Sequence, residues 1–161
     1  MKKVFHFESL RGRYLCDAAI LWCFDNRFEL CFRKFLKRIG VVYSDPIKIA
    51  GGAKCMASLE HDNDREFVLE QIRKSMRLHG TKRVILMVHS DCGAYGGLAD
   101  GFHGDSRAEA IHHEQELRRA AANLSETLPE IEIQAYFVDF EGVWDVEIPC
   151  GYREPQRQES A

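Results

Sequence analysis

Two runs of uninterrupted apolar residues constrain the fold of this chain more than any other feature. Residues 18–23 (AAILWC) and 84–88 (VILMV) have the length of a strand and no alternation of polar and apolar side chains. Strands of this kind are buried on both faces, as the central strands of a parallel sheet are. We therefore expect both runs in the middle of a sheet that helices cover on its two sides.

Segments with helical spacing alternate with strand-length runs along the chain. The expected helices are 28–39, 62–78 and 106–126, and the further expected strands are 46–50, 131–140 and a short 143–148. Ser106 and Glu109 have the spacing of a capping box at the start of the third helix. This alternation predicts parallel crossover units. The expected fold class is α/β, a single domain with a mainly parallel central sheet of four to five strands flanked by helices.

Length and charge narrow the class of protein further. The chain has 161 residues and a formal net charge of −3, so we expect one domain over residues 1–150 and a polar tail over 151–161. No strongly basic field is present, which argues against a nucleic-acid binder. The apolar runs are too short to cross a membrane, and no apolar export signal follows the first lysines. A cytoplasmic protein is the expectation.

Six cysteines occur in the sequence, at positions 16, 23, 31, 55, 92 and 150. In a chain without an export signal they are expected to be reduced thiols or metal ligands rather than a disulfide framework. Those at 16, 31, 55 and 150 are interpreted as structural, because cysteine is among the most buried residue types.

Polar residues follow three of the expected strands at the point where each strand ends. These strand ends read CFDNR at 23–27, AGG at 50–52 and HSDCG at 89–93. Ligands of open parallel sheets bind at the carboxyl ends of the strands. The three segments are therefore expected to meet at one edge of the sheet.

Cys23, His89 and Cys92 form the set of two thiolates and one imidazole that suits zinc in a tetrahedral site. Three protein ligands leave the fourth position for water or for a nearby carboxylate. Asp25 is placed to be that neighbour, and Arg27 can hold it as a bidentate ion pair. An Asp25 held in this way stays off the metal and can accept a hydrogen bond from bound water.

The three segments together resemble the signature of the β-class carbonic anhydrases. The resemblance implies one zinc ion per chain on Cys23, His89 and Cys92, with Asp25 and Arg27 as the catalytic pair that orients zinc-bound water. It also implies that Asp25 can swing onto the metal and close the site. The residues that would line the substrate pocket are Ala50, Gly51, Gly52 and Gly93. The family further implies homodimers with exchanged helices, often assembled into larger homo-oligomers.

The activity that the resemblance implies is the reversible hydration of CO₂ to bicarbonate by zinc-bound hydroxide. The chain has Asn26, Ile49 and Val88 where the family usually has serine, asparagine and glycine. These differences keep two alternatives open: a hydrolase of carbonyl sulfide or carbon disulfide on the same scaffold, and a non-catalytic zinc-binding protein. A thiol redox protein is a weaker alternative, because the chain has no Cys-x-x-Cys pair.

Four further residues near the signature have two interpretations each. Asp91 is either an acceptor behind the metal ligands or a turn residue, and Tyr95 either lines the cleft or packs. His112 and His113 are adjacent on the expected third helix, so their side chains point in different directions. They are expected to be surface or interface residues, with proton transfer as the lesser alternative.

Overall fold

The computed structural model describes residues 1–9, 11–58 and 62–148, and the side chain of Asp62 is not described. Cys150 and the expected tail over 151–161 lie outside the described residues. In this part of the chain, no helix has both the length and the apolar character needed to span a membrane.

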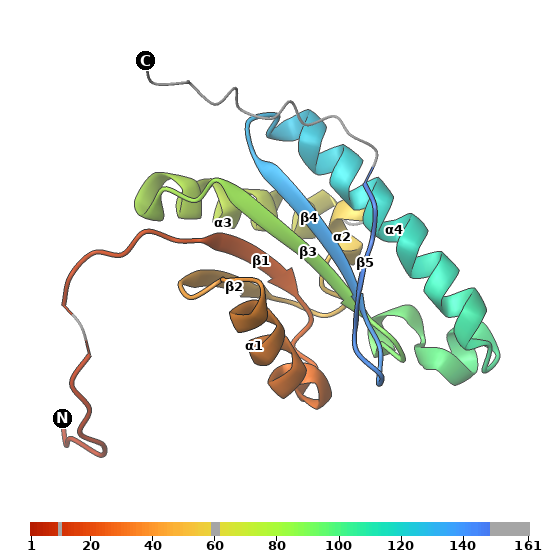
Figure 1. Cartoon of the computed structure of the whole chain (residues 1–161), viewed down its shortest axis with the longest axis horizontal. Helices are drawn as coiled ribbons and strands as arrows, with labels where there is room; N and C mark the ends of the chain where they lie inside the picture. The colour runs from red at the N-terminus through yellow and green to blue at the C-terminus, as the bar shows by residue number, and fades with distance from the viewer. Residues whose placement is uncertain (10, 59–61, 149–161) are drawn as a thin grey trace.

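Five strands form one sheet in the order β2-β1-β3-β4-β5 (Figure 1). The strands are β1 (Ala18–Trp22), β2 (Ser44–Lys48), β3 (Arg83–His89), β4 (Glu132–Val138) and β5 (Val143–Asp145). The first four are parallel to their neighbours, whereas β5 pairs with β4 in the antiparallel sense. The mainly parallel α/β sheet expected from the sequence is confirmed.

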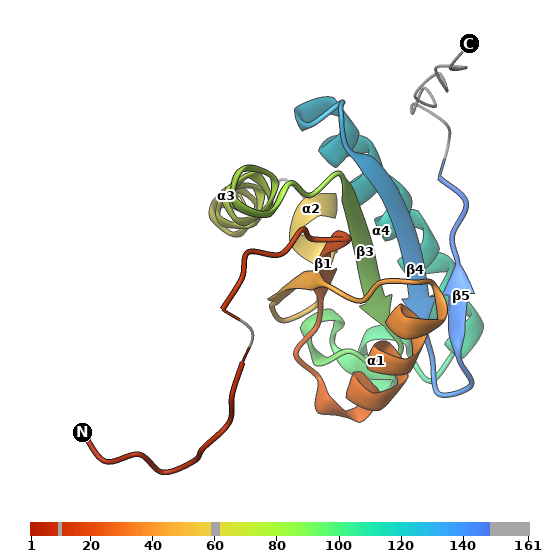
Figure 2. The same cartoon turned by 60° about the vertical axis from the view of Figure 1, so that its left-hand side comes forward.

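Helices cover both faces of the sheet (Figures 1 and 2). They are α1 (Glu29–Arg38), α2 (Lys54–Ala57), α3 (Asp62–His79) and α4 (Ser106–Thr127). One core packs α1 against the sheet, and a larger core packs α2, α3 and α4 against the opposite face.

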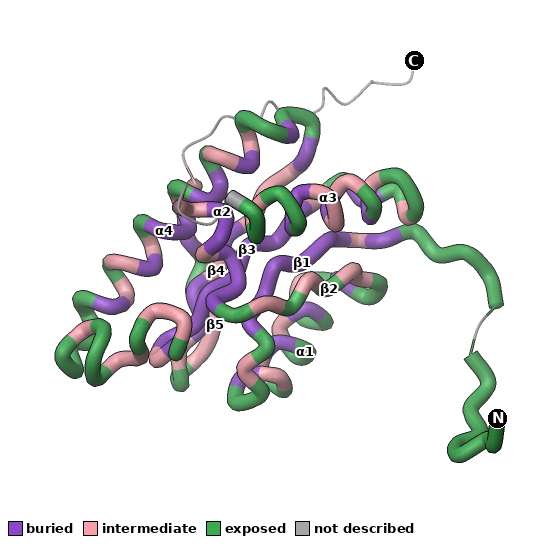
Figure 3. Tube along the Cα trace, turned by 180° about the vertical axis from the view of Figure 1, so that it is seen from behind, coloured by how far each residue is buried: buried purple, intermediate pink, exposed green. Residues whose placement is uncertain are grey.

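The central position of β1 and β3 follows from their uninterrupted apolar sequence. All five residues of β1 are buried, as are six of the seven in β3 (Figure 3). Successive side chains of a strand point to opposite faces. Accordingly Ala19, Leu21 and Leu86 enter the larger core, while Ile20 and Ile85 enter the core under α1.

Strand β2 lies two residues earlier than the sequence predicted. It begins at Ser44, which pairs with Ala18, and ends at Lys48 rather than at residue 50. The pairing extends back because the Asp17 amide donates to the Tyr43 carbonyl at 2.8 Å. Pro46 is tolerated in the strand because β2 is at the edge of the sheet, where a missing amide hydrogen costs little.

The capping box expected at Ser106 is wrong. Asp105 is the N-cap of α4, and its carboxylate accepts hydrogen bonds from the amides of Arg107 and Ala108, both at 2.9 Å. Glu109 is therefore not engaged at the helix start and is turned into the protein, where it is 1% exposed. The sequence also missed α2, which is one turn long and has no periodicity to detect.

Candidate metal centre

Three ligating side chains converge just past the ends of β1 and β3. The ligand atoms of Cys23, His89 and Cys92 all lie within 4.8 Å of one another, and all three residues are buried. The two sulfur atoms are 4.0 Å apart. Tetrahedral zinc with Zn–S bonds of about 2.3 Å needs sulfur atoms about 3.8 Å apart. The spacing of the cluster thus fits a tetrahedral metal ion.

His89 turns its Nε2 atom towards this cluster. Its Nδ1 lies 2.8 Å from the backbone carbonyl oxygen of Ser90. A carbonyl oxygen only accepts, so Nδ1 carries a hydrogen, and in the neutral imidazole Nε2 then carries a lone pair. Nε2 is buried and finds no hydrogen-bond partner among the described residues. A buried lone pair aimed at two sulfur atoms is the arrangement that a metal ligand requires.

The two thiols differ in their tendency to ionise. A hydrogen bond from the Cys92 thiol lowers the pKa of Cys23, against the opposing effect of burial. The same contact and burial raise the pKa of Cys92. Cys23 is thus ready to act as a thiolate, and a cation bound between the sulfurs would displace the proton that remains on Cys92.

Asp25 is held by Arg27 next to the cluster. Arg27 Nε lies 3.1 and 3.0 Å from the two carboxylate oxygens, and Nη2 lies 2.7 Å from Oδ2. These hydrogen bonds lower the pKa of Asp25, so the carboxylate is ionised at neutral pH. Asp25 Oδ2 is also 3.9 Å from His89 Nε2. The carboxylate therefore lies beside the ligand cluster while Arg27 engages both of its oxygens.

The same guanidinium reaches the turn after β3. Its Nη1 donates to Asp91 Oδ2 at 2.8 Å and its Nη2 to the Asp91 carbonyl at 2.9 Å. Asp91 has a φ of 53°, a left-handed conformation that is uncommon for a residue other than glycine. Its Oδ1 accepts from the Leu98 amide at 2.8 Å, which is the main cause of its lowered pKa. Asp91 is therefore a turn residue, and its carboxylate accepts from Arg27 and Leu98 rather than from a candidate metal ligand.

Aromatic rings enclose one side of the cluster. The Phe28 ring lies 4.8 Å from the His89 ring, and the Trp22 ring lies 5.6 Å from it. Phe140, from the turn between β4 and β5, lies 5.0 Å from Phe28. The Arg27 guanidinium is 5.7 Å from both the Phe28 and the Phe140 ring. The charged pair is therefore bordered by an apolar wall.

The glycine turn after β2 closes against the cluster from the other side. A Cβ on Gly52 would lie 2.3 Å from the Met87 carbonyl oxygen and 3.1 Å from the Cys23 amide nitrogen. Gly52 therefore permits close packing of the turn against β1 and β3. By contrast, Gly93 has open space where a side chain would be.

A cavity of about 390 Å³ lies next to this turn. It is lined by Ile49, Ala50, Lys54, Cys55, Asp64, Phe67 and Ala94. Ala50 was expected in the pocket, whereas Lys54 and Phe67 had no sequence signal. Burial raises the pKa of Cys55 to about 12, so this thiol is protonated although it lines the cavity.

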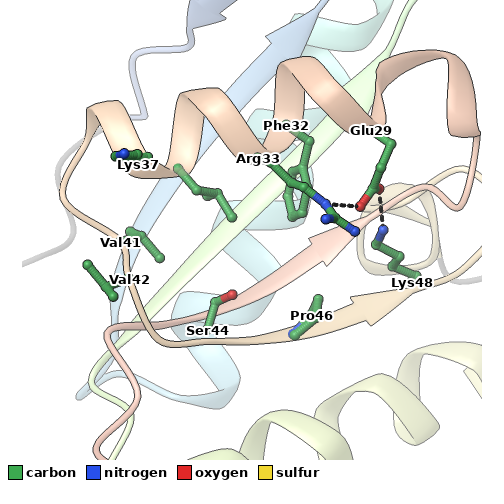
Figure 4. Close-up of a pocket in the computed structure, with 10 residues that line it drawn as sticks. Glu29, Phe32, Arg33, Lys37, Val41, Val42, Ser44, Pro46 and Lys48 are labelled. Carbon is green, nitrogen blue, oxygen red and sulfur yellow. Dashed lines mark hydrogen bonds and ion pairs between the residues drawn. The ribbon is translucent and has the colours of Figure 1, made fainter. Parts of the chain in front are cut away.

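A second groove of about 500 Å³ lies between α1 and β2 (Figure 4). Glu29 on its rim binds both Arg33 and Lys48. None of the residues that line the groove belongs to the Cys23, His89 and Cys92 cluster.

The surface position expected for His113 is wrong. The side chain is fully buried on the inner face of α4, and burial lowers its pKa to about 3. Its ring lies 4.5 Å from the Tyr95 ring, so Tyr95 packs against α4. Glu109, one turn earlier on α4, is also buried and contacts the turn after β3. The spacing of four residues places Glu109 and His113 on one face of α4, but it does not show which face of the helix is buried.

Comparison with known proteins identifies the family and the fold of the chain. A profile of the family described as "Putative carbonic anhydrase" matches residues 15–149 of the chain. An uncharacterised protein of Rickettsia bellii is 22% identical over 138 residues, covering 84% of both chains. One from Rickettsia conorii is 20% identical over 138 residues, covering 84% of this chain and 74% of its own.

Among solved structures, β-carbonic anhydrase isoform I of Trichomonas vaginalis is similar with a TM-score of 0.55 and 16% identity. The match covers 88% of this chain and 87% of that one. The sheet and its helices thus have the β-carbonic anhydrase fold. Because the family profile spans most of the sequence, the chain belongs to the carbonic anhydrase family.

Proposed function

We propose that Cys23, His89 and Cys92 hold one zinc ion and that the protein catalyses the reversible hydration of CO₂ to bicarbonate. The observation that carries this proposal concerns His89 Nε2, which is buried and has no hydrogen-bond partner among the described residues. This atom lies 3.9 Å from Oδ2 of Asp25, the carboxylate that Arg27 holds. A ligand cluster alone would fit a structural metal. A cluster with an ionised carboxylate beside it fits a catalytic site in which the carboxylate accepts a proton.

The donor set favours zinc over harder cations. Two thiolates and one imidazole suit a borderline-soft ion, whereas magnesium and calcium prefer oxygen ligands. When bound, zinc supplies a Lewis acid that lowers the pKa of water towards about 7, which makes a nucleophile available at neutral pH. Three ligands from the chain leave one position for that water.

Asp25 is proposed to hold and orient the proton of the attacking water. Its pKa is lowered by the hydrogen bonds from Arg27, so it acts as an acceptor over the neutral pH range. Arg27 fixes the direction of the carboxylate with hydrogen bonds to both oxygens. It also keeps a positive charge near the point where negative charge develops on the product.

The aromatic wall is proposed to admit CO₂ and to restrict water. The Phe28 ring packs against both the His89 ring and the Phe140 ring. An apolar wall next to a fixed ion pair lets a small apolar substrate approach and keeps the electrostatic interactions of Asp25 strong.

The engagement of Asp25 by Arg27 corresponds to an open site. For Asp25 to become a fourth ligand, its carboxylate would have to give up hydrogen bonds to Arg27. We infer that Arg27 opposes closure, and that loss of Arg27 favours the closed, inactive form.

Hydrolysis of carbonyl sulfide or carbon disulfide is the second candidate function. The observation that favours it is Ile49, an apolar residue lining the cavity beside Ala50 where the family usually has asparagine. A more apolar pocket suits a sulfur analogue of CO₂, and the chemistry of the metal would be shared.

We also propose that the chain forms a homodimer or a larger homo-oligomer. Support comes from the first residues, which run away from the sheet and expose the apolar side chains of Val4, Phe5 and Phe7 (Figures 1 and 2). Exposed aromatic side chains on an extended segment are typical of a contact between chains.

Stopped-flow CO₂ hydration on protein of known metal content tests the proposed function. About one zinc per chain together with hydration activity supports it. Zinc with sulfide release from carbonyl sulfide but no hydration supports the second candidate. Zinc with neither activity leaves a structural role, and protein without metal after purification and zinc reconstitution rejects the proposal.

A further inference from the structure

Glu109 is a buried carboxylate that the proposed reaction does not use. It lies in the first turn of α4 and is 1% exposed. Its Oε2 accepts from the Ser90 hydroxyl at 2.5 Å, and its Oε1 accepts from the Asp91 amide at 2.6 Å. Removing a carboxylate from water is costly unless donors replace the lost hydration. The donors are the side-chain hydroxyl of Ser90 and the backbone amide of Asp91, the two residues that follow His89.

Ser90 and Asp91 contact both the candidate metal ligand His89 and Arg27, which holds Asp25. The carbonyl of Ser90 accepts from His89 Nδ1 at 2.8 Å, which sets the plane and the tautomer of the imidazole. The side chain and carbonyl of Asp91 accept from Arg27. The Ser90 to Asp91 link is therefore bonded to the metal-ligand candidate on one side and to the holder of Asp25 on the other.

The conformation of this link needs external support. Asp91 has a φ of 53°, a left-handed conformation that is unfavourable for most residues with a side chain. The Asp91 amide, directed at Glu109, is held in that conformation by a short hydrogen bond. Without an acceptor at this place, the turn would lose the contact that fixes the Asp91 amide.

We propose that Glu109 is a positioning residue of the metal centre, which fixes the Ser90 and Asp91 link and thereby aligns His89 with the Asp25 and Arg27 pair. The inference rests on the proposed zinc site, but not on the identity of the substrate. It predicts that α4 acts on the site through two hydrogen bonds, without touching a reacting atom. The effect of losing them should appear first in metal affinity and ligand geometry.

The test compares Glu109→Ala with Glu109→Gln and with the control Glu116→Gln. Glutamine can accept from the Asp91 amide and donate to Ser90 Oγ, so it can rebuild both bonds. Glu116 is another buried carboxylate on the same helix, seven residues later, and it pairs with Arg119 instead of the turn. The control thus reports the general cost of altering a buried carboxylate on α4.

Zinc affinity is measured by chelator competition, and ligand geometry is read from the absorption spectrum of the Co²⁺-substituted protein. Glu109→Ala should weaken zinc binding by about 10- to 100-fold and change the Co²⁺ spectrum, as loss of a residue behind a metal ligand does. Glu109→Gln should recover most of the affinity, and Glu116→Gln should match the wild type. Wild-type affinity and spectrum in Glu109→Ala, an equal loss in Glu116→Gln, or no recovery in Glu109→Gln would overturn the proposal.

A metal-free measurement keeps this inference separate from the proposed function. The Asp91 amide proton resonance of the metal-free protein reports the hydrogen bond to Glu109 directly, and it should shift upfield in Glu109→Ala. If Glu109→Ala does not fold, Ser90→Ala replaces it as the test variant, because it removes one hydrogen-bond donor to Glu109 and creates little empty space. It should weaken zinc binding several-fold, and unchanged affinity would contradict the proposal. Absent CO₂ hydration in a wild type with these properties would reject the function alone.

Discussion

Arg27 binds Asp91 through both the carboxylate and the carbonyl oxygen of that residue, at 2.8 and 2.9 Å. These two residues are 64 positions apart, and their contact joins the loop after β1 to the turn after β3. The guanidinium that holds Asp25 is therefore itself fixed by the segment that supplies two of the three candidate ligands.

Replacement of Arg27 by lysine should lower kcat/KM for CO₂ hydration by about tenfold or more. An ammonium group cannot reproduce the fork that reaches Asp25 and Asp91 together. Zinc content should stay near one per chain. Arg33→Lys is the matched control, because Arg33 pairs with Glu29 away from the cluster. Equal activity of Arg27→Lys and the wild type in a stopped-flow assay would show that the fork is not needed.

Replacement of Asp25 by alanine should leave zinc bound and remove most of the hydration activity. Asp25 is not one of the three candidate metal ligands, so zinc should still bind. Asp25 is the proposed proton acceptor, so the reaction should be impaired. The expected loss in kcat is about 100-fold or more. Asp25→Asn keeps the shape without the charge and should be almost as impaired. Full activity in either variant at equal zinc content would refute the role given to Asp25.

Replacement of Gly52 by alanine should destabilise the fold. The new Cβ would lie 2.3 Å from the Met87 carbonyl oxygen, at a φ of 55°. A clash with backbone on a central strand predicts a loss of more than about 2 kcal/mol in the free energy of unfolding. Gly93→Ala is the control, since nothing lies within 4 Å of the added atom. Urea denaturation compares the two, and similar stabilities would argue against close packing at Gly52.

The stabilising effect of Arg27 should disappear in acid. The pKa of Asp25 is lowered in the folded protein, chiefly by the hydrogen bonds from Arg27. A carboxylate with a lowered pKa stabilises the fold above its unfolded value of about 3.9, and this contribution is lost as the pH falls through the folded pKa. The difference in unfolding free energy between wild type and Arg27→Ala should thus be constant near neutral pH and shrink below about pH 4.

A ¹³C titration of the Asp25 carboxyl in metal-free protein checks the cause. The midpoint should move upward in Arg27→Ala, towards the ordinary value of an aspartate. A midpoint that stays low in this variant would assign the shift to another group.

The sequence predicted the parts of the structure that depend on local pattern. The runs at 18–23 and 84–88 placed β1 and β3 because a strand buried on both faces needs apolar residues at every position. The strand ends then placed Cys23, Asp25 and His89 at one edge, because parallel strands end on the same side.

The parts that the sequence missed depend on how helices meet the sheet. Asp105 and Ser106 are both good N-cap residues, and only the phase of α4 on the sheet decides between them. That phase turns Glu109 and His113 inward, so neither burial could be read from spacing alone. Likewise, Phe140 reaches Arg27 only because β5 folds back on β4.

X-ray absorption at the zinc edge tests the central claim most directly, because it reports the atoms bound to the metal. Cys23, His89 and Cys92 predict two sulfur neighbours at about 2.3 Å and one imidazole nitrogen at about 2.0 Å, with a light atom in the fourth position. The His89→Ala variant should lose the nitrogen shell of the imidazole and keep both sulfurs. A zinc site without sulfur neighbours, or with the imidazole signal unchanged in His89→Ala, would contradict the account.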